Sequence, residues 1–588
     1  MEIAQNFKRS NKTLIKKYLE FFISMLLSTL FLQFTTVVDT IIVGQLLGTT
    51  PMSGIKIAMP IINILTIFAT FIGVGSSTII SIFMGRRKTK EVNISFTFSL
   101  LACVLIGGIL AAIISPLSNQ IASLLSNDAE IISHAATYIR IVMGGGIFFI
   151  LASVFAILFR SDGFTKLSMI VLVTGGLMNV CFDLIFMKVL NLGVAGSAYA
   201  TFLGMVLACF VGLTYFFFKH HSFKFANIFN KENKTILKGL IKPISKTGLS
   251  SALRLLFTNL SLIVINIFIG KQVGVFGIAV MTICSNMQLI LSAFFTAGGQ
   301  AMMPFCGVLY GSKDNTGIKL LLKFVFSFIC CLVVILIVIV EIIAPQIYSL
   351  FNVADPNNQG AFYLRIYLIG ILPVAINYIL VYYFSTIQKQ KYALLIAFLE
   401  NILLYLPLAI GLLYPLAMTG IVIAFIIAEL LTILITLLIV HLEKKKKNLS
   451  NLMLLPDNPP ELIYEATTSA SLENISNITK EIHTILVDKN VPDVDAYKTA
   501  LAIEEMLSNA ANIDRNKKRK VYFDISILYI KDNITISLRD NGVVNNPIIN
   551  LTDEDYKENF ESVVILNKVA KSIKYNRVME LNHTIIEI

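Results

Sequence analysis

The sequence predicts an all-α membrane protein with twelve transmembrane helices in two pseudo-symmetric six-helix lobes, followed by a small cytoplasmic α/β domain. Composition is the first reason. Of the 588 residues, 56% are hydrophobic and only 14% are charged, and the mean hydropathy is +0.77. Soluble domains carry about 25% charged residues. The second reason is a series of long apolar stretches, and the third is an internal repeat. Disordered, collagen-like and disulfide-rich secreted chains are excluded.

Twelve apolar stretches make up the membrane part. A helix needs about 20 predominantly apolar residues to cross the hydrocarbon core of a bilayer. The first stretch follows basic residues and lacks a small-residue cleavage site, so we interpret it as an uncleaved span. The stretches lie at roughly 18–46, 56–84, 96–115, 135–159, 167–189, 193–218, 247–269, 276–303, 320–345, 361–385, 392–413 and 418–441.

The distribution of charge predicts the orientation. Residues 1–450 contain 33 Lys and Arg against 15 Asp and Glu, whereas residues 451–588 contain 15 against 21. With the N-terminus inside, most basic loops, including the one with Arg160 and Lys166, fall on the cytoplasmic side. We therefore expect both termini in the cytoplasm and the chain in a prokaryotic plasma membrane. The bilayer explains the positive charge, so nucleic acid is not expected as a partner.

An internal repeat relates the two halves of the membrane part. Tyr138 and Arg140 recur as Tyr363 and Arg365, an offset of 225 residues. Two glycine pairs recur with nearly the same offset: Gly85 with Gly311 and Gly196 with Gly420. Two six-helix copies that enter from the same side predict a pseudo-two-fold axis along the membrane normal, with binding near the midplane between them.

The repeat and the composition divide the chain into five parts. We expect a first lobe at 1–220, a cytoplasmic loop at 221–246, a second lobe at 247–441, a linker at 442–470 and an α/β module at 471–588. In the module, 473–487, 496–513 and 561–573 suit helices. Residues 520–530 and 533–540 alternate like paired strands joined by a turn at 531–533, and 577–588 suits a final strand pair.

Acidic residues inside the first-lobe spans are candidates for function. Insertion of a charged residue at the middle of a membrane costs a free energy of at least about 2.5–3.5 kcal/mol, so such residues usually have a function. Asp39 lies in the first span, and Asn179 and Asp183 share one face of the fifth because they are four residues apart. With Thr201 of the sixth span they suit a bound cation or a shared proton. The alternative is a buried, satisfied polar cluster between helices.

The second half contains a different set of charged groups. Arg254 lies early in the seventh span and is expected to pair with Glu400 or Glu429, and Gln300 lies in the eighth. We regard these four residues as candidates for substrate contact. The alternatives are a structural ion pair and a snorkelling side chain.

Several motifs resemble the multidrug and toxic compound extrusion (MATE) family. They are VDTIIVGQLLG (38–48), GVGSSTIISIFMG (73–85), FRSDG (159–163), NVCFD (179–183) and LGVAGSAYAT (192–201), with GGQAMMPFCGVLYGSKD (298–314) and TGIVIAFIIAE (419–429) in the second half. The resemblance covers nearly all of 15–441. It implies export of cationic drugs driven by inward H⁺ or Na⁺ flow, with the coupling ion at Asp39, Asn179, Asp183 and Thr201. Where some members carry an acid early in the seventh span, this chain has Arg254.

The tail contains a second set of motifs. In LAIEEMLSNAANID (501–514), Glu505 can orient water, and Asn509, four residues later, can ligate Mg²⁺. In LRDNGVVNNP (538–547), Asp540 can accept the exocyclic amine of adenine and Gly542 lets the backbone approach. These motifs resemble the GHKL ATP-binding fold, and most closely the serine kinases that act as anti-sigma factors. This implies Mg-ATP as a cofactor of the tail and Glu505 as its catalytic residue.

The tail departs from that pattern in the residues expected to wrap the phosphates. The second glycine of the usual D-x-G-x-G is Val544, and the expected glycine-bearing turn near 561–565 contains Val563 and Val564. Backbone amides next to these side chains are less free to cradle a phosphate. The alternative is a degenerate module that binds a partner.

These observations together predict a secondary active exporter of cationic amphipathic molecules, coupled to H⁺ or Na⁺. The tail would sense nucleotide or a cytoplasmic regulatory protein. One rival is a lipid-linked oligosaccharide flippase of the same superfamily, which generally needs a cationic groove. The other is a membrane receptor coupled to a serine-kinase-like signalling domain.

Overall fold

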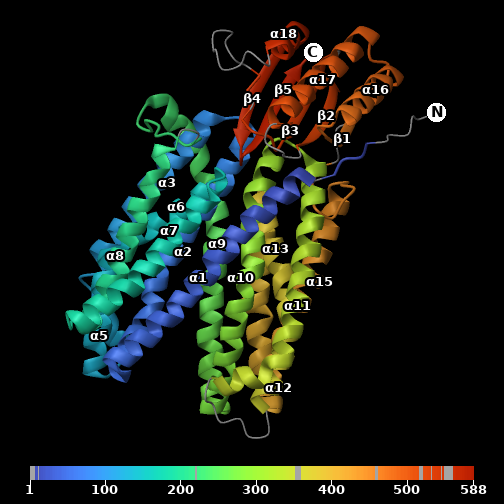
Figure 1. The fold of residues 1–588 in the computed structure, drawn as a ribbon. Helices are drawn as coiled ribbons and strands as arrows, with labels where there is room; N and C mark the ends of the chain where they lie inside the picture. The colour runs from blue at the N-terminus through green and yellow to red at the C-terminus, as the bar shows by residue number, and fades with distance from the viewer. Residues whose placement is uncertain are drawn as a thin grey trace. The chain divides into compact units, whose positions relative to one another are not determined.

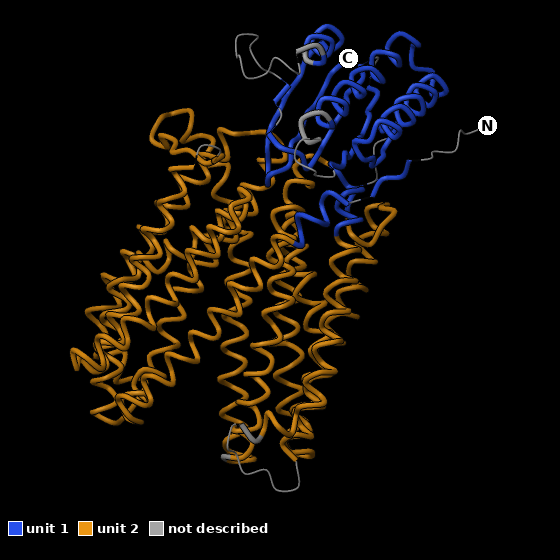
Figure 2. The backbone as a smooth tube through the Cα atoms, in the orientation of Figure 1, with its two compact units in different colours: residues 1–19, 314–321, 455–588 blue, residues 20–313, 322–454 orange. Residues whose placement is uncertain are grey.

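The computed structural model describes the chain except for residues 1–6, 11, 219–220, 351–358, 457–460, 516–520, 531–532, 545 and 548–559. It divides into two compact units, shown in different colours in Figure 2. Residues 20–313 and 322–454 form the membrane unit. Residues 1–19, 314–321 and 455–588 form the tail unit. The tail therefore shares its unit with two short segments that lie far away in the sequence.

The first lobe of the membrane unit is built from the helices of the N-terminal half. A π-helical turn at Leu184–Val189 follows α7, and a 3₁₀ turn at Thr214–Phe217 follows α8. The helices are α1 (Lys12–Leu47), α2 (Thr49–Gly85), α3 (Thr89–Ile114), α4 (Ser118–Leu125), α5 (Ala129–Gly144), α6 (Gly146–Ser161), α7 (Thr165–Asp183) and α8 (Gly193–Leu213).

The second lobe repeats this plan. A π-helical turn at Leu399–Leu403 connects α14 to α15. The helices are α9 (Lys231–Gln272), α10 (Val275–Gly311), α11 (Asn315–Leu350), α12 (Gln359–Ile369), α13 (Ile371–Thr386), α14 (Gln390–Phe398) and α15 (Tyr405–Lys446). Gly48 precedes α2 and Gly274 precedes α10, and both have positive φ (86° and 80°) that favours glycine. The internal repeat is therefore visible in the backbone.

The structure does not confirm twelve separate spans. In the described residues ten helical stretches are long and apolar enough to cross a membrane, or eleven if α5 and α6, bent by 57°, form one span. The expected spans 392–413 and 418–441 fall in one helical stretch, Gln390–Lys446. Within α15 the non-helical backbone is at Ala417 (φ 49°), two residues after Pro415. A kink, rather than a loop, thus joins these two segments.

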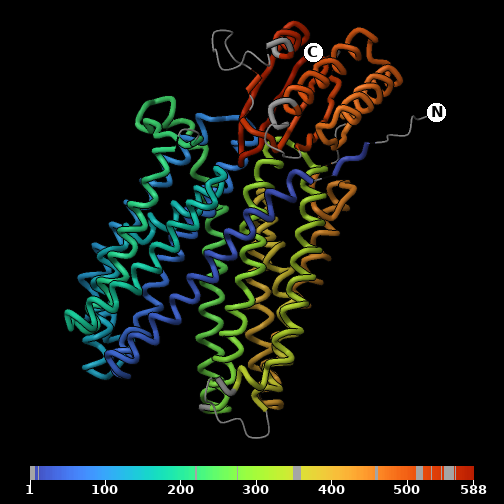
Figure 3. Tube along the Cα trace, viewed as in Figure 1, coloured from blue at the N-terminus to red at the C-terminus, as the bar shows by residue number. Residues whose placement is uncertain are grey.

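The two lobes approach each other at the ends of α2 and α10 and diverge toward the opposite end (Figure 3). The contact depends on the repeated glycines. A Cβ atom on Gly85 would lie 2.1 Å from the carbonyl oxygen of Val308, and one on Gly311 would lie 2.1 Å from that of Ile82. Only hydrogen fits at these two positions, so the glycines let the helix backbones touch.

The tail unit contains a five-stranded antiparallel sheet of order β1-β2-β3-β5-β4. Helices α16 and α17 lie side by side on the sheet (Figure 1). The strands are β1 (Leu462–Ser469), β2 (Tyr522–Ile530), β3 (Asn533–Asp540), β4 (Ser572–Val578) and β5 (Leu581–Glu587), and the helices are α16 (Leu472–Asp488), α17 (Asp493–Arg515) and α18 (Phe560–Val569).

The tail elements differ from the expectation in two places. Strand β1 forms where a linker was expected at 442–470, because its alternate residues are buried against the helices. The helix expected at 561–573 ends at Val569, and β4 starts at Ser572, before the strand pair expected at 577–588. The expected turn at 531–533 lies largely outside the described residues.

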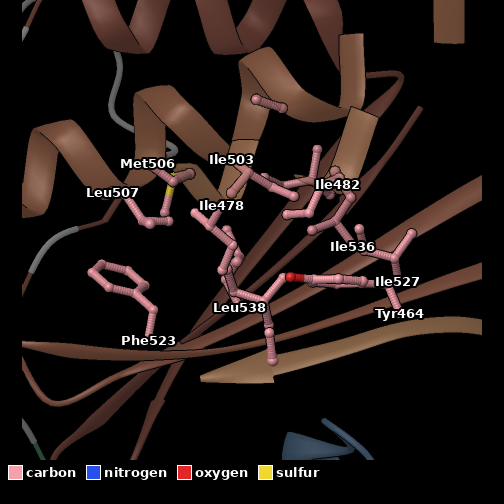
Figure 4. Packing of buried hydrophobic residues seen from close by; sticks show 14 of the residues in the cluster. Tyr464, Ile478, Ile482, Ile503, Met506, Leu507, Phe523, Ile527, Ile536 and Leu538 are labelled. Atoms are coloured by element: carbon pink, nitrogen blue, oxygen red, sulfur yellow. The ribbon is translucent and has the colours of Figure 1, made fainter. Parts of the chain in front are cut away.

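The hydrophobic core of the tail unit lies between the sheet and its helices. Alternate residues of β2 and β3, such as Ile527 and Ile536, face Ile482 of α16 and Ile503 of α17 (Figure 4). Phe7, from the start of the chain, packs against the same core. The core is therefore completed by a segment that no local pattern of the tail predicts.

A buried cluster of charged residues ties three segments of the tail unit together. Asp314, which precedes α11, accepts hydrogen bonds from Arg9 (2.8 Å) and from Arg539 of β3 (3.1 Å). Arg9 also lies 3.6 Å from Glu465 and 3.8 Å from Asp524. Opposite charges are thus paired out of water, where removal of one partner is strongly destabilising.

Candidate functional site

The four polar residues predicted in the first lobe come from three helices. Asp39 lies on α1, Asn179 and Asp183 lie on α7, and Thr201 lies on α8. Asp183 is fully buried and ends α7, immediately before the π-helical turn. Single π turns inside helices occur frequently at functional sites. The structure brings Asp39 and Asp183 within hydrogen-bonding reach of each other.

The two carboxyl groups have unsatisfied oxygens. Oδ1 of Asp39 and both carboxylate oxygens of Asp183 are buried with no hydrogen-bond partner among the described residues. The neighbouring hydroxyl of Ser197 is also buried without a partner. Two ionised carboxylates can only accept hydrogen bonds, so neither can satisfy the other. A proton or a cation between them would remove both the repulsion and the missing bonds.

An amide and two hydroxyl groups continue this site. Asn179 Nδ2 donates to Thr201 Oγ1 at 3.1 Å, and Tyr138 Oη lies 3.4 Å from the same hydroxyl. Thr201 in turn donates to the backbone oxygen of Ser197 at 3.2 Å. Tyr138 and Ser197 were not predicted from the sequence as site residues. The internal repeat, in which Tyr138 corresponds to Tyr363, was the sequence feature that could have identified Tyr138.

The acidic residues of the second lobe have protein partners. Arg254 binds Oε1 of Glu400 through Nε (2.9 Å) and Nη2 (2.8 Å), and its guanidinium lies 3.3 Å from the ring centre of Tyr378. Glu429 accepts from Asn377 Nδ2 at 2.7 Å. Of the two acids expected as partners of Arg254, Glu400 therefore forms the ion pair.

A cavity of about 330 Å³ lies between the lobes of the membrane unit. The same three helices of each copy line it: α1, α2 and α6 of the first lobe, and α9, α10 and α13 of the second. Its charged lining residues are Arg160 and Arg254, and no Asp or Glu of the described residues lines it. Asp39, Asp183, Glu400 and Glu429 thus lie outside the cavity wall.

Arg160 is placed differently from the expectation. The charge pattern predicts a cytoplasmic loop for Arg160, but this residue lies in the last turn of α6 and lines the cavity. It donates to the backbone oxygen of Ala156 (2.9 Å) and, across the cavity, to Oε1 of Gln300 on α10. An arginine at the end of an apolar stretch has the same local sequence in either location, so only packing distinguishes them.

The predicted nucleotide residues of the tail lie on α17 and at the end of β3. Asn509 is buried, and its Oδ1 has no hydrogen-bond partner among the described residues. Asp540 Oδ1 accepts from the backbone amide of Gly542 (2.9 Å) and from Asn582 (2.8 Å). Glu505 is half-buried one turn before Asn509 on α17. Helix α17 packs against β3 and α18.

The expected phosphate turn has a different structure. Residues 561–565, with Val563 and Val564, lie in the helix α18 rather than in a turn. Val544 is exposed. Within α18 the backbone amides of Val564 and Ile565 lie beyond the first turn and donate to helix carbonyls, whereas the amides of the first turn have no acceptor within the helix.

Comparison with known proteins identifies the membrane part. The MatE family model matches residues 24–185 and 251–410, which together are more than half of the chain. The chain belongs to the MatE family. Like other members it is a multi-pass membrane transporter, and the two matched segments correspond to its two lobes.

Curated relatives cover this MatE protein over three quarters of its length. "Multidrug export protein MepA" of Staphylococcus haemolyticus is 23% identical over 443 residues, which are 75% of this chain and 96% of that protein. The protein of the same name from Staphylococcus aureus strain MSSA476 is 23% identical over 445 residues, covering 75% and 97%.

Solved structures share the fold of this MatE protein. An outward-facing multidrug resistance MATE transporter of the MOP superfamily aligns with a TM-score of 0.69 at 19% identity, covering 75% of this chain and 100% of that one. A MOP superfamily transporter from Pyrococcus furiosus, described as having a binding pocket of reverse polarity, aligns with a TM-score of 0.68 at 18% identity and covers 75% of this chain and 100% of that one.

Proposed function

We propose that this MatE protein is a secondary active exporter of amphipathic small molecules, driven by the inward movement of H⁺ or Na⁺. The observation that carries the proposal is the pair of carboxyl groups, Asp39 and Asp183, whose buried oxygens have no hydrogen-bond partner among the described residues. Intramembrane acids are costly and mark ion and substrate pathways. The relatives named multidrug export proteins support the same activity.

The coupling follows from the chemistry of the two carboxyl groups. Uptake of a proton or a cation removes their repulsion and supplies the missing bonds, so the loaded and empty site favour different packings of α1 against α7. A ligand shifts an equilibrium between two states by its difference in affinity for them. The lobes diverge at one end, and the positive-inside rule assigns this end to the outside of the cell. Binding of the proton or cation to the carboxyl groups would then favour the state in which the lobes close at this outer end, which completes the cycle.

The test is transport by the full chain in proteoliposomes with an imposed pH or sodium gradient. Wild-type protein should move a fluorescent amphipathic probe under one of the gradients, and an ionophore that collapses this gradient should stop it. Asp39→Asn and Asp183→Asn should lose coupled transport. Glu130→Gln, a matched change at an exposed carboxylate, should retain it. Coupled transport by Asp39→Asn would contradict the role of the first-lobe site.

The charge of the substrate is a separate question. The family resemblance implies an organic cation, which the first-lobe carboxylates would attract. The cavity itself has two arginines and no acidic lining residue among those described, and this favours the second candidate function, a flippase or exporter of an anionic molecule. Cationic and anionic probes in the same proteoliposome assay distinguish the two.

We also propose that the tail regulates the transporter. The buried cluster of Arg9, Asp314, Arg539, Asp524 and Glu465 lies within the tail unit, and the first residues of α1 and α11 belong to that unit. Both helices continue without a break into the membrane unit, one into each lobe. A change in the tail therefore has a covalent route to both lobes.

The ligand proposed for the tail is Mg-ATP or a cytoplasmic regulatory protein. A sheet covered by helices, with Asn509 on α17 and Asp540 at the end of β3, supports a GHKL-like nucleotide site. The helical segment 561–565 favours a partner protein. A fluorescent ATP analogue with Mg²⁺ tests this on the full chain. Binding that Asp540→Ala and Asn509→Ala abolish, and that Asp488→Asn retains, would support nucleotide. If the wild-type chain does not bind the ATP analogue, the alternative of a tail that binds a regulatory protein is favoured. Phosphotransfer by the tail without transport by the membrane part would favour the alternative of a membrane receptor coupled to a serine-kinase-like domain.

A further inference from the structure

The cavity between the lobes is lined by groups that suit one anionic group. Besides the two arginines, its wall carries neutral donors on every lining helix, among them Gln33, Ser77 and Ser251. Hydroxyl, amide and guanidinium groups all donate hydrogen bonds to carboxylate, sulfonate or phosphate oxygens. Apolar wall residues such as Ile157 and Leu255 provide contact for the rest of an amphipathic ligand.

The two arginines differ in their partners. Arg254 is neutralised by Glu400, which binds two of its nitrogens, and its flat face is covered by Tyr378. Arg160 forms no ion pair within the described residues. Its protein partners are the neutral Ala156 oxygen, the Met25 sulfur and the Gln300 amide oxygen.

A guanidinium within the membrane unit that has no carboxylate partner is costly and is expected to face a ligand or water pathway. Nη1 of Arg160 is occupied by Gln300 and Met25, and Nε by Ala156, whereas Nη2 has no hydrogen-bond partner among the described residues. Gln300 also donates weakly to Tyr382 Oη at 3.5 Å. Its amide oxygen thus occupies a position where a charged oxygen would bind Arg160 more strongly.

We propose that this cavity binds the anionic group of an amphipathic substrate through Arg160. The inference rests on the proposed export function and specifies its substrate class. The anion displaces or joins Gln300 at the guanidinium, while its apolar part contacts the cavity wall. Because Arg160 lies on α6 and Gln300 on α10, the anion binds where the two lobes meet.

The experiment measures binding of a matched pair of probes to the purified full chain. One is a naphthalene fluorophore with a sulfonate group, and the other is the same ring system with a trimethylammonium group. Wild-type protein should bind the sulfonate more tightly than the ammonium probe. Gln300→Glu keeps the shape of the side chain but places a carboxylate beside Arg160, so sulfonate binding should weaken on the order of 10- to 100-fold, the value of a charge-assisted hydrogen bond.

Variants of Arg160 and a matched control complete the experiment. Arg160→Gln should weaken sulfonate binding by a similar factor, and Arg160→Lys should retain a large part of it because the charge remains. Arg365→Gln, at a half-exposed arginine paired with Glu341, should bind like wild type. Elution as a single species on size exclusion shows that each variant is folded. Equal binding of both probes to wild type, or unchanged sulfonate binding by Gln300→Glu, would overturn the proposal.

Two further arms identify the source of the anion and separate this inference from the export function. In nanodiscs of phosphatidylcholine, competition by added phosphatidylglycerol would identify a lipid headgroup as the anion. Sulfonate binding that phosphatidylglycerol does not affect would identify a free small molecule. Asp39→Asn should keep sulfonate binding while it loses transport. If the wild-type protein binds the sulfonate probe but transports nothing, the export proposal is wrong and the proposal of anion binding through Arg160 still holds.

Discussion

Arg160 of the first lobe donates a hydrogen bond to Gln300 of the second lobe across the central cavity. This bond joins two residues 140 positions apart and links α6 to α10. The bond holds the lobes together at one point. It also uses one donor nitrogen of the Arg160 guanidinium, the charged group that faces the cavity. Changes at Gln300 therefore test both.

Gln300→Ala should strengthen anion binding, whereas Gln300→Glu should weaken it. In Gln300→Ala the guanidinium of Arg160 loses a neutral acceptor and gains space, so we expect the sulfonate probe to bind several-fold more tightly. A titration of the purified full chain measures this, with Gln288→Ala as a control glutamine on the same helix but outside the cavity wall. Weaker sulfonate binding by Gln300→Ala would show that the amide itself binds the anion.

The ion pair between Arg254 and Glu400 should be important for stability. Glu400→Gln leaves the guanidinium of Arg254 buried without a counter-charge, and removal of one member of a buried pair costs about 3–5 kcal/mol. Thermal unfolding of the full chain in detergent should show a clearly lower midpoint. Glu341→Gln, which affects the exposed pair with Arg365, should change stability by no more than about 1 kcal/mol. The double variant Arg254→Met and Glu400→Gln should recover much of the loss, and an additive loss would contradict this account.

The glycine contact between the lobes should tolerate no side chain. Gly85→Ala places a methyl group 2.1 Å from the Val308 oxygen, so α2 and α10 must separate. We expect a lower unfolding midpoint and impaired transport, with the same result for the repeat-related Gly311→Ala. In Gly108→Ala the methyl group would lie 3.8 Å from Ile147, an ordinary contact distance, so this variant is the control. Wild-type behaviour of Gly85→Ala would show that the lobes do not need this close approach.

The Asp314 carboxylate should stabilise the tail unit over the physiological pH range. Burial alone raises the pKa of Asp314, but the positive charges of Arg9 and Arg539 outweigh burial and hold that pKa well below its ordinary range. The stabilisation is therefore complete above about pH 4, the ordinary value for aspartate, and is lost only as the pH falls further. Between pH 5 and 8 we expect no change from this group.

Asp314→Asn tests the cluster directly. The substitution leaves Arg9 and Arg539 close together without their shared carboxylate, so hydrogen exchange of the β2 and β3 amides should become faster in the full chain. Glu580→Gln removes the partly exposed pair with Lys17 and should have little effect. Unchanged exchange in Asp314→Asn would mean that the sheet does not depend on its contact with the segment before α11.

The amino-acid pattern alone predicts much of the fold because it follows local rules. Long apolar stretches, basic loops and the 225-residue repeat indicate the two lobes, and the repeat reappears in the backbone at Gly48 and Gly274. The alternation in 520–530 and 533–540 predicts two paired strands, and β2 and β3 form there at Tyr522–Ile530 and Asn533–Asp540. Strand β1 was missed because its short alternating pattern follows a proline-rich segment, and pairing with β2 decides its conformation.

The sequence by itself determined the membrane class, the repeat and the intramembrane acids Asp39 and Asp183, because an acid within an apolar stretch is recognisable without any knowledge of its neighbours. Only the tertiary structure decided that Arg160 faces the cavity, that Arg254 pairs with Glu400, and that Arg9 and Asp314 belong with the tail. These relationships join residues between 140 and 515 positions apart. Their energies depend on packing that brings remote charges out of water together, and no local pattern specifies such a contact.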